Sequence, residues 1–188
     1  EGAKVAVKLD GDDVELEKLS NTTFKQTSTP IFCAPLVFGG VAGGNVYEGD
    51  GESRIHLRSG KVEDDTTWTA QDVLVELDGD VNVDKEAKLV IEAGSRFIVE
   101  DGVKLNVGYY DRATLELAGT KEAPIVFQGL REVAGAWGPM TFHKKSRGNR
   151  IAHVELRHVT GDAAVVVKGE ADGFFRGFGV AAAEDFFE

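Results

Sequence analysis

The chain contains very little cysteine and proline. Its 188 residues include one cysteine, Cys33, and four prolines, against 23 glycines. A single cysteine excludes an internal disulfide and a cysteine-based metal cluster, and the neighbours Phe32 and Ala34 predict that Cys33 is buried as a small hydrophobic residue. Many glycines with few prolines indicate frequent tight turns, because glycine readily adopts the positive φ that such turns require.

The sequence also lacks an excess of positive charge and any long apolar run. Lysine and arginine number 21 against 32 acidic residues, which gives a formal net charge of −11 at pH 7. An acidic field repels polyanions, so we expect no nucleic-acid partner. No apolar run reaches the length of a membrane span, and we expect no direct membrane insertion. The apolar content of 42% is sufficient for a hydrophobic core.

Short alternating apolar segments run through most of the chain. Apolar residues recur at every second position, and each segment is ended by Gly, Asp or Asn. The clearest segments lie at residues 73–77, 81–83, 89–91, 97–99, 103–107, 115–117 and 125–127. A period of two indicates β-strands, and no stretch offers the helical crossover of a conventional parallel sheet. The pattern therefore predicts an all-β solenoid in which short strands stack coil on coil.

Changes in composition divide the chain into three parts. Residues 1–38 predict the terminal coils of a preceding β-helix segment. Residues 39–67 are rich in glycine and acidic residues around one clear strand at Ile55 and Leu57, which predicts a junction. Residues 68–188 predict a second β-helix segment. Because the chain starts on a strand pattern and without Met, we expect it to be a processed form or a part of a longer protein.

Four sequence blocks follow one another between residues 87 and 156. They are residues 87–94, 117–127, 136–142 and 149–156, and in order they resemble the patterns L-x-I-x-x-G, G-T-x-x-x-P-I-x-F, W-x-x-I-x-F and N-x-I-x-x-V. In this order the chain resembles the right-handed parallel β-helix repeat proteins of bacterial surfaces, secreted proteins and lipoproteins, which share the pectate-lyase-like superfold. Gln128, where Thr is usual, and Pro139, where a small residue is usual, depart from the patterns.

The resemblance implies a fold and a location more than an activity. It implies a right-handed parallel β-helix over residues 68–178, in a protein that is extracellular or on the outer cell surface. This superfold carries lyases, glycoside hydrolases, adhesins and inert spacers alike, so it does not specify a reaction. The sequence has no lyase signature and no serine-hydrolase, phosphate-loop, zinc or dinucleotide motif.

The most concentrated polar pattern lies in and before residues 151–158. Alternation predicts that Val154 and Leu156 point inward and that their neighbours form an exposed row. Together with a preceding histidine and a basic loop, this row could bind an anionic glycan or supply a general base and a charge clamp. The alternative is a solvated strand face with cross-strand ion pairs. The predicted ligand-binding residues are His143, His153, Glu155 and Arg157.

Acidic turns recur along the chain and are candidates for calcium binding. Calcium takes about six to eight oxygen ligands, and clustered aspartates with glycine suit it. None of the turns has EF-hand spacing, so plain Asp-Gly turns are the alternative. The predicted metal ligands are Asp10, Asp12, Asp13, Asp78 and Asp80. We expect no other cofactor.

Together these patterns predict a non-catalytic structural or adhesive β-helix segment of a larger bacterial surface or secreted protein. A solenoid is stiff and leaves its outer faces free to vary, which suits a spacer or a carbohydrate-binding or protein-binding surface. The predicted partners are other proteins, glycans or further copies of the chain in self-assembly. The alternative is a polysaccharide lyase or glycoside hydrolase that acts on an acidic polysaccharide.

Overall fold

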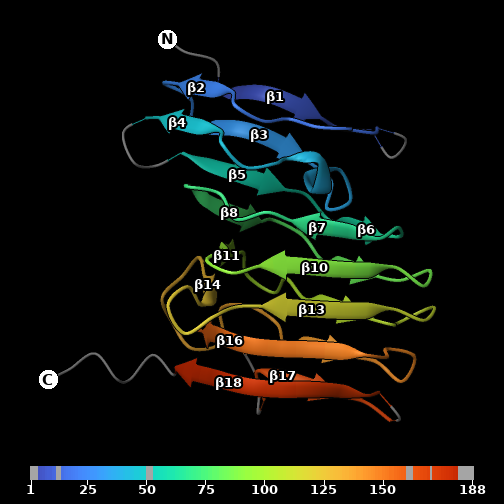
Figure 1. Ribbon diagram of the computed structural model, residues 1–188. Helices are drawn as coiled ribbons and strands as arrows, with labels where there is room; N and C mark the ends of the chain where they lie inside the picture. Colours follow the sequence, from blue (N-terminus) through green and yellow to red (C-terminus); the bar gives the residue numbers. More distant parts are fainter. Residues whose placement is uncertain (1–3, 12–13, 50–52, 160–162, 170, 182–188) are drawn as a thin grey trace, which may run out of the picture.

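The chain winds into a parallel β-helix of about six turns, whose strands stack from the N-terminal to the C-terminal end (Figure 1). The computed structural model describes residues 4–11, 14–49, 53–159, 163–169 and 171–181. These residues contain one short 3-10 helix, η1 (Val37–Gly40), and no α-helix. The prediction of an all-β parallel solenoid is therefore confirmed.

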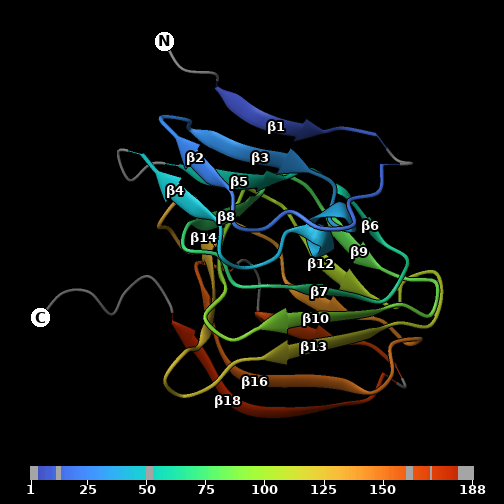
Figure 2. The same cartoon turned by 45° about the horizontal axis from the view of Figure 1, so that its top comes forward.

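The β-helix has three faces, and each turn contributes a strand to each face over most of its length (Figure 2). The first face contains β1 (Val5–Leu9), β3 (Thr29–Cys33), β5 (Arg54–Leu57), β8 (Leu74–Leu77), β11 (Arg96–Val99) and β14 (Ile125–Gly129). The second face contains β6 (Gly60–Val62), β9 (Val81–Val83), β12 (Leu105–Val107), β15 (Met140–Phe142) and β17 (Val165–Val167). The third face contains β7 (Thr66–Trp68), β10 (Lys88–Glu92) and β13 (Thr114–Ala118).

Two long strands near the C-terminal end belong to two faces each. The first half of β16 (Asn149–Arg157) pairs with β13, and its second half pairs with β14. The bend falls at His153, whose φ of 49° lies in the left-handed region and turns the chain from the third face to the first. The backbone of β18 (Gly173–Ala181) follows both halves of β16. In the first turns, β2 (Thr23–Lys25) and β4 (Val46–Glu48) form a separate two-stranded sheet.

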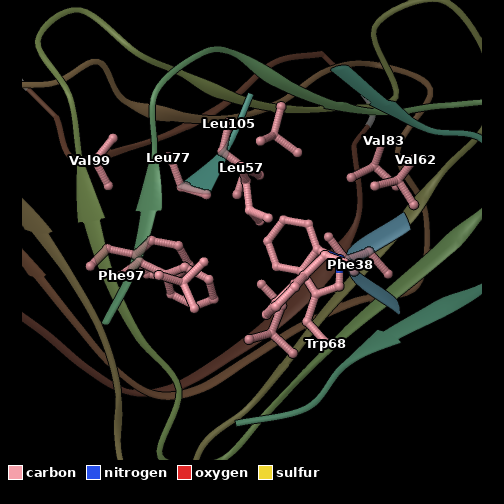
Figure 3. Packing of buried hydrophobic residues seen from close by; sticks show 14 of the residues in the cluster. Phe38, Leu57, Val62, Trp68, Leu77, Val83, Phe97, Val99 and Leu105 are labelled. Atoms are coloured by element: carbon pink, nitrogen blue, oxygen red, sulfur yellow. The ribbon is translucent and has the colours of Figure 1, made fainter. Parts of the chain in front are cut away.

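The interior is filled by columns of apolar side chains that stack from coil to coil (Figure 3). On the first face the strand register aligns Ile55 with Val75, Val75 with Phe97, and Phe97 with Phe127. The rings of Phe97 and Phe127 stack with their centroids 4.6 Å apart. Period-two alternation produces these columns, because every second side chain of each strand points into the coil.

An aromatic column extends this packing along the axis. Trp68 contacts Phe38 on one side and Phe97 on the other, with centroid distances of 5.6 and 5.8 Å. Its indole N–H donates to the carbonyl of Pro35 at 3.0 Å, so its polar group is satisfied although the side chain is fully buried. Cys33 is also buried, as predicted, and burial raises the pKa of its thiol to about 12.

Residues 39–67 contain more structure than the sequence indicated. The expectation of one clear strand there was wrong, because β4, β6 and β7 lie in the same interval as β5. Each of these strands has three residues and at most one buried side chain, which is too few to display an alternating apolar pattern. β5 pairs with both β3 and β8, so the first-face sheet runs through this interval. The assignment of residues 39–67 as a junction between two segments of a longer protein stays a prediction.

The stacked core predicts a large effect of truncating a central ring. Phe127→Ala is expected to lower the free energy of unfolding by about 3–5 kcal/mol, because it leaves a cavity between two coils. Urea denaturation followed by circular dichroism measures the loss. Tyr110→Ala is the matched control, since its ring is 58% exposed and its loss should cost about 0.5 kcal/mol. Equal losses in the two variants would contradict the assigned core.

Candidate functional site

The structure separates the predicted ligand-binding residues between two edges of the third face. His143 directly follows β15 of the second face, whereas Glu155 and Arg157 lie on the first-face half of β16, with His153 at the bend before them. The third-face half of β16 lies between the two groups. His143 therefore does not join the others in one site, because the chain turns two corners between them.

The exposed row itself has the predicted orientation. Val154 and Leu156 are buried, and the side chains of Glu155 and Arg157 point outward and remain partly exposed. Arg157 Nη2 donates to Glu155 Oε2 at 2.5 Å. Because both residues belong to one strand, this ion pair does not link neighbouring coils.

His143 lies in a half-buried environment beside an exposed tyrosine. Its Nε2 atom is 3.2 Å from Asn106 Oδ1, and its ring makes an edge-to-face contact with Tyr109 at a centroid distance of 4.7 Å. Burial lowers the pKa of His143, and the nearby Lys168 lowers it further, whereas Asp84 opposes the shift. His143 is thus held mainly neutral at pH 7.

The described members of the predicted metal set make other contacts. Asp10 pairs with Lys8 at 2.7 Å, which lowers its pKa, and Asp80 Oδ1 accepts a hydrogen bond from the backbone N–H of Lys104 at 2.8 Å. Asp12 and Asp13 lie outside the described residues. Within the described residues no group of three or more His, Cys, Asp or Glu side chains is arranged to hold a metal ion. Calcium binding at the acidic turns stays a prediction.

A cluster of titratable groups lies on the first face and was not found from the sequence. Strand register places His56 of β5 beside Glu76 of β8. Glu76 Oε2 accepts a hydrogen bond from Arg54 at 2.9 Å and lies 3.8 Å from His56 Nε2. On its other side, His56 Nδ1 lies 3.7 Å from Asp78 Oδ2. Both histidine contacts are longer than a hydrogen bond, so they act mainly as charge interactions.

The electrostatics of this cluster favour retention of protons. The neighbouring Asp78 carboxylate raises the pKa of His56, with a further contribution from Glu76, against the opposing effects of burial and Arg54. Burial raises the pKa of Glu100, and the charges of Glu76 and Asp78 raise it further. A histidine and a carboxyl group with raised pKa values are a chemically competent proton donor and acceptor.

A pocket lies near this cluster but does not enclose it. It has a cavity volume of ≈ 360 Å³ and is lined by Val14, Leu36, Arg58 and Lys61 among others. Arg58, which follows β5, pairs through its Nε atom with Asp10 Oδ1 at 3.6 Å. The lining includes none of the carboxylates Glu76, Asp78 and Glu100. The carboxylates therefore lie outside this pocket, and within the cluster the Arg54–Glu76 ion pair joins neighbouring coils.

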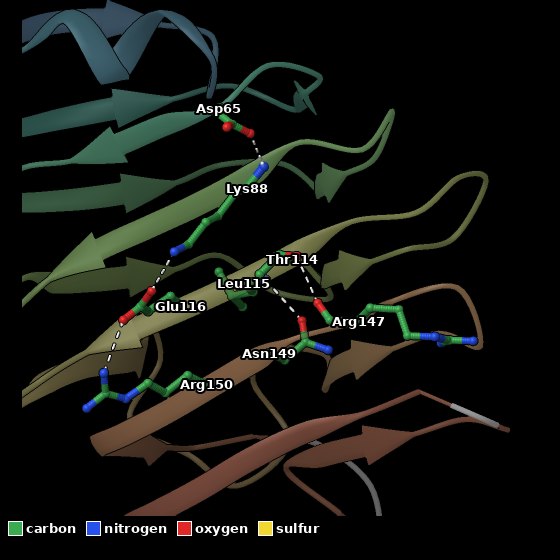
Figure 4. A network of polar contacts seen from close by, with 8 residues as sticks. All are labelled: Asp65, Lys88, Thr114, Leu115, Glu116, Arg147, Asn149 and Arg150. Atoms are coloured by element: carbon green, nitrogen blue, oxygen red, sulfur yellow. Dashed lines mark hydrogen bonds and ion pairs between the residues drawn. The ribbon is translucent and has the colours of Figure 1, made fainter.

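A second polar network crosses the third face (Figure 4). Glu116 of β13 pairs with Lys88 of the preceding coil at 2.8 Å and with Arg150 of the following coil at 3.4 Å. These contacts lower the pKa of Glu116, and Lys88 makes the larger contribution. The Glu116 carboxylate thus connects three consecutive coils. In the same network, Asn149 Oδ1 accepts a hydrogen bond from the backbone N–H of Leu115 at 3.0 Å.

Comparison of the chain with protein-family models, with curated proteins and with solved structures found no match. In the described part of the chain, no helix is long and apolar enough to cross a membrane.

The raised pKa of His56 predicts a pH-dependent contribution to stability. Its folded-state pKa lies above the unfolded value, so its stabilisation is fully present below about pH 6.5 and is lost as pH rises through the folded pKa. His56→Gln should therefore lower the free energy of unfolding more at about pH 5.5 than at about pH 8.5, by about 0.5–1 kcal/mol. Urea denaturation of both proteins at the two pH values measures this difference.

His143→Gln is the matched control for this experiment. The pKa of His143 is lowered, so its protonation below about pH 6.5 destabilises the folded state. The difference between wild type and His143→Gln should consequently have the opposite dependence on pH. A His56→Gln effect that is independent of pH, or that grows with rising pH, would contradict the assigned cluster.

Proposed function

We propose that the chain is a rigid, non-catalytic β-helix segment of a larger bacterial surface or secreted protein. Its role is structural or adhesive: it sets the distance between other parts of the protein, and its outer faces bind proteins, glycans or further copies of the chain. The resemblance of its sequence blocks to bacterial parallel β-helix repeat proteins supports the extracellular or outer-surface location.

The observation that carries this proposal is the pairing of outward charges between coils. On the first face Arg54 pairs with Glu76, and on the third face Glu116 pairs with Lys88 and Arg150. Ion pairs between coils resist bending and sliding of one coil over the next, although each exposed pair contributes only about 0–1 kcal/mol. Added to a continuous core, they suit a stiff spacer better than a mobile catalytic site.

A second candidate function is a polysaccharide lyase or glycoside hydrolase that acts on an acidic polysaccharide. The raised pKa values of His56 and Glu100 on one sheet face favour it, because this chemistry needs a group that is protonated near neutral pH. One observation argues against an enzyme. Glu76, a carboxylate that such a reaction would use, is buried and already paired with Arg54.

The test is a screen of acidic polysaccharides with the purified chain, with and without calcium. Retention on immobilised polygalacturonate, alginate and heparin reports binding, and released unsaturated or reducing ends report turnover. The proposal predicts no turnover in either condition. Turnover that disappears in His56→Gln/Glu100→Gln would contradict it and establish the enzyme.

A matched variant addresses the exposed row of β16. Like the unmodified chain, His153→Ala/Glu155→Ala/Arg157→Ala should show no turnover, and the substitutions should alter partner binding at most. Turnover that is lost in this triple variant and kept in His56→Gln/Glu100→Gln would place a catalytic centre at the row and would also contradict the non-catalytic role.

A further inference from the structure

Two adjacent tyrosine rings stand exposed at the turn that follows β12. Tyr109 is 53% exposed and Tyr110 is 58% exposed, so both rings face solvent. They contact each other edge to face at a centroid distance of 4.6 Å, and Tyr109 makes the same kind of contact with His143 at 4.7 Å. Tyrosine rings are enriched at interaction surfaces, and adjacent exposed rings form a contiguous apolar patch of the kind that marks such a surface.

The backbone holds these rings in a fixed position. The buried carboxylate of Asp84 accepts hydrogen bonds from the backbone N–H groups of Tyr110 and Asp111 at 2.9 and 3.1 Å. Gly108, which precedes the rings, has a φ of +70°, and a Cβ there would lie 2.4 Å from Ser146 N. The turn at residues 144–146 can therefore pack directly against the tyrosine turn. A fixed surface loses little conformational entropy when it binds a ligand.

A row of amide groups leads to the rings along the second face. Strand register aligns Asn82 of β9 with Asn106 of β12. Asn106 Nδ2 donates to Asn82 Oδ1 at 3.1 Å, and Asn106 Oδ1 lies 3.2 Å from His143 Nε2. Both asparagines are half-buried and keep hydrogen-bonding capacity toward solvent, because an amide group carries two donors and an acceptor with two lone pairs.

Lysines surround this part of an otherwise acidic chain. Lys61 Nζ lies 5.5 Å from the centroid of the Tyr110 ring, and Lys145 Nζ donates to the carbonyl oxygen of Tyr110. Lys168 directly follows β17, just as His143 directly follows β15 on the preceding coil, so the two residues are aligned. Glu63 and Asp111 approach Lys61 and Lys145 at 3.3 and 3.9 Å, respectively. Lys144 and Lys168 are exposed and have no ion-pair partner among the described residues.

We propose that Tyr109, Tyr110, His143, Asn106 and the surrounding lysines form a binding surface for an anionic, uronate-bearing oligosaccharide. The apolar C–H face of a sugar ring packs on a tyrosine ring, the amides and imidazole hydrogen-bond its hydroxyl groups, and the lysines attract its carboxylates. We call this set of residues the tyrosine surface. This inference rests on the proposed adhesive function, because it names the class of ligand and the face of the β-helix that binds it.

The test is calorimetric titration of the chain with a hexamer of galacturonic acid and with its fully methyl-esterified form. The acid should bind, and at low salt its affinity should exceed that of the ester about tenfold, because the ester lacks the carboxylates. Tyr109→Ala/Tyr110→Ala should weaken binding about tenfold, whereas Tyr109→Phe/Tyr110→Phe, which keeps both rings, should retain it within about threefold. Circular dichroism checks that each variant is folded.

Two further variants separate charge from location. Lys61→Gln/Lys168→Gln should weaken binding of the acid several-fold and reduce its dependence on salt, with little effect on the ester. His153→Ala/Glu155→Ala/Arg157→Ala, on another edge of the β-helix, should leave the affinity unchanged.

Several results would overturn the tyrosine surface. They are no binding of the acid at millimolar concentration, full affinity in Tyr109→Ala/Tyr110→Ala, or loss of affinity in the variant of residues 153, 155 and 157. In the last case the adhesive function would stand and only the assigned face would be wrong. Turnover of the hexamer would contradict the proposed function itself, so the two failures are distinguishable.

Discussion

Parallel pairing between consecutive coils is the constraint on which the other features of this chain depend. The strands are mostly three to five residues long, and a strand in the middle of the stack obtains its backbone hydrogen bonds from the coils before and after it. A short strand is not stable alone, so each coil requires its neighbours. The same pairing sets the register, and the register determines which side chains meet.

Register converts single residues into rows with a common property. Inside, it stacks Phe97 on Phe127, and the aromatic column continues to Trp68. Outside, it brings Glu116 between Lys88 and Arg150 and places Asn82 beside Asn106. The first and third faces use their outward rows for ion pairs between coils. The second face carries amides that lead to exposed aromatic rings, and this is the face on which we propose that a ligand binds.

The fold could be predicted because its signal is local. Alternation at Val75 and Leu77 or at Leu89 and Ile91 identifies strands without any knowledge of their partners, and all these residues are buried. The three-residue strands β6 and β7 were missed because each has only one buried side chain, whereas the three-residue strand β9 has two and was predicted. The same alternation correctly oriented Glu155 and Arg157 outward on β16.

The polar sites could not be predicted because their signal is not local. His56 and Glu76 are 20 residues apart in sequence and meet only through the register of β5 and β8. Coil lengths vary, so this register cannot be counted from the sequence: Val75 aligns with Phe97, 22 residues later, and Phe97 aligns with Phe127, 30 residues later. His143 and His153 are ten residues apart but lie at different corners. The exposed pair Tyr109 and Tyr110 was visible in the sequence, yet only the fold shows that amides and lysines gather beside it.

The register itself is tested most directly by crosslinking on the third face, where Val90 lies between Thr67 and Glu116 on adjacent coils. Adjacent strands are about 4.8 Å apart, within disulfide range, whereas positions two coils apart are about 10 Å apart and beyond it. Mild oxidation of dilute protein should form an intramolecular disulfide in Thr67→Cys/Val90→Cys and none in Thr67→Cys/Glu116→Cys, with the buried Cys33 unreactive. No disulfide in the first variant, or equal disulfide formation in both, would contradict the coil-to-coil register and the surfaces that depend on it.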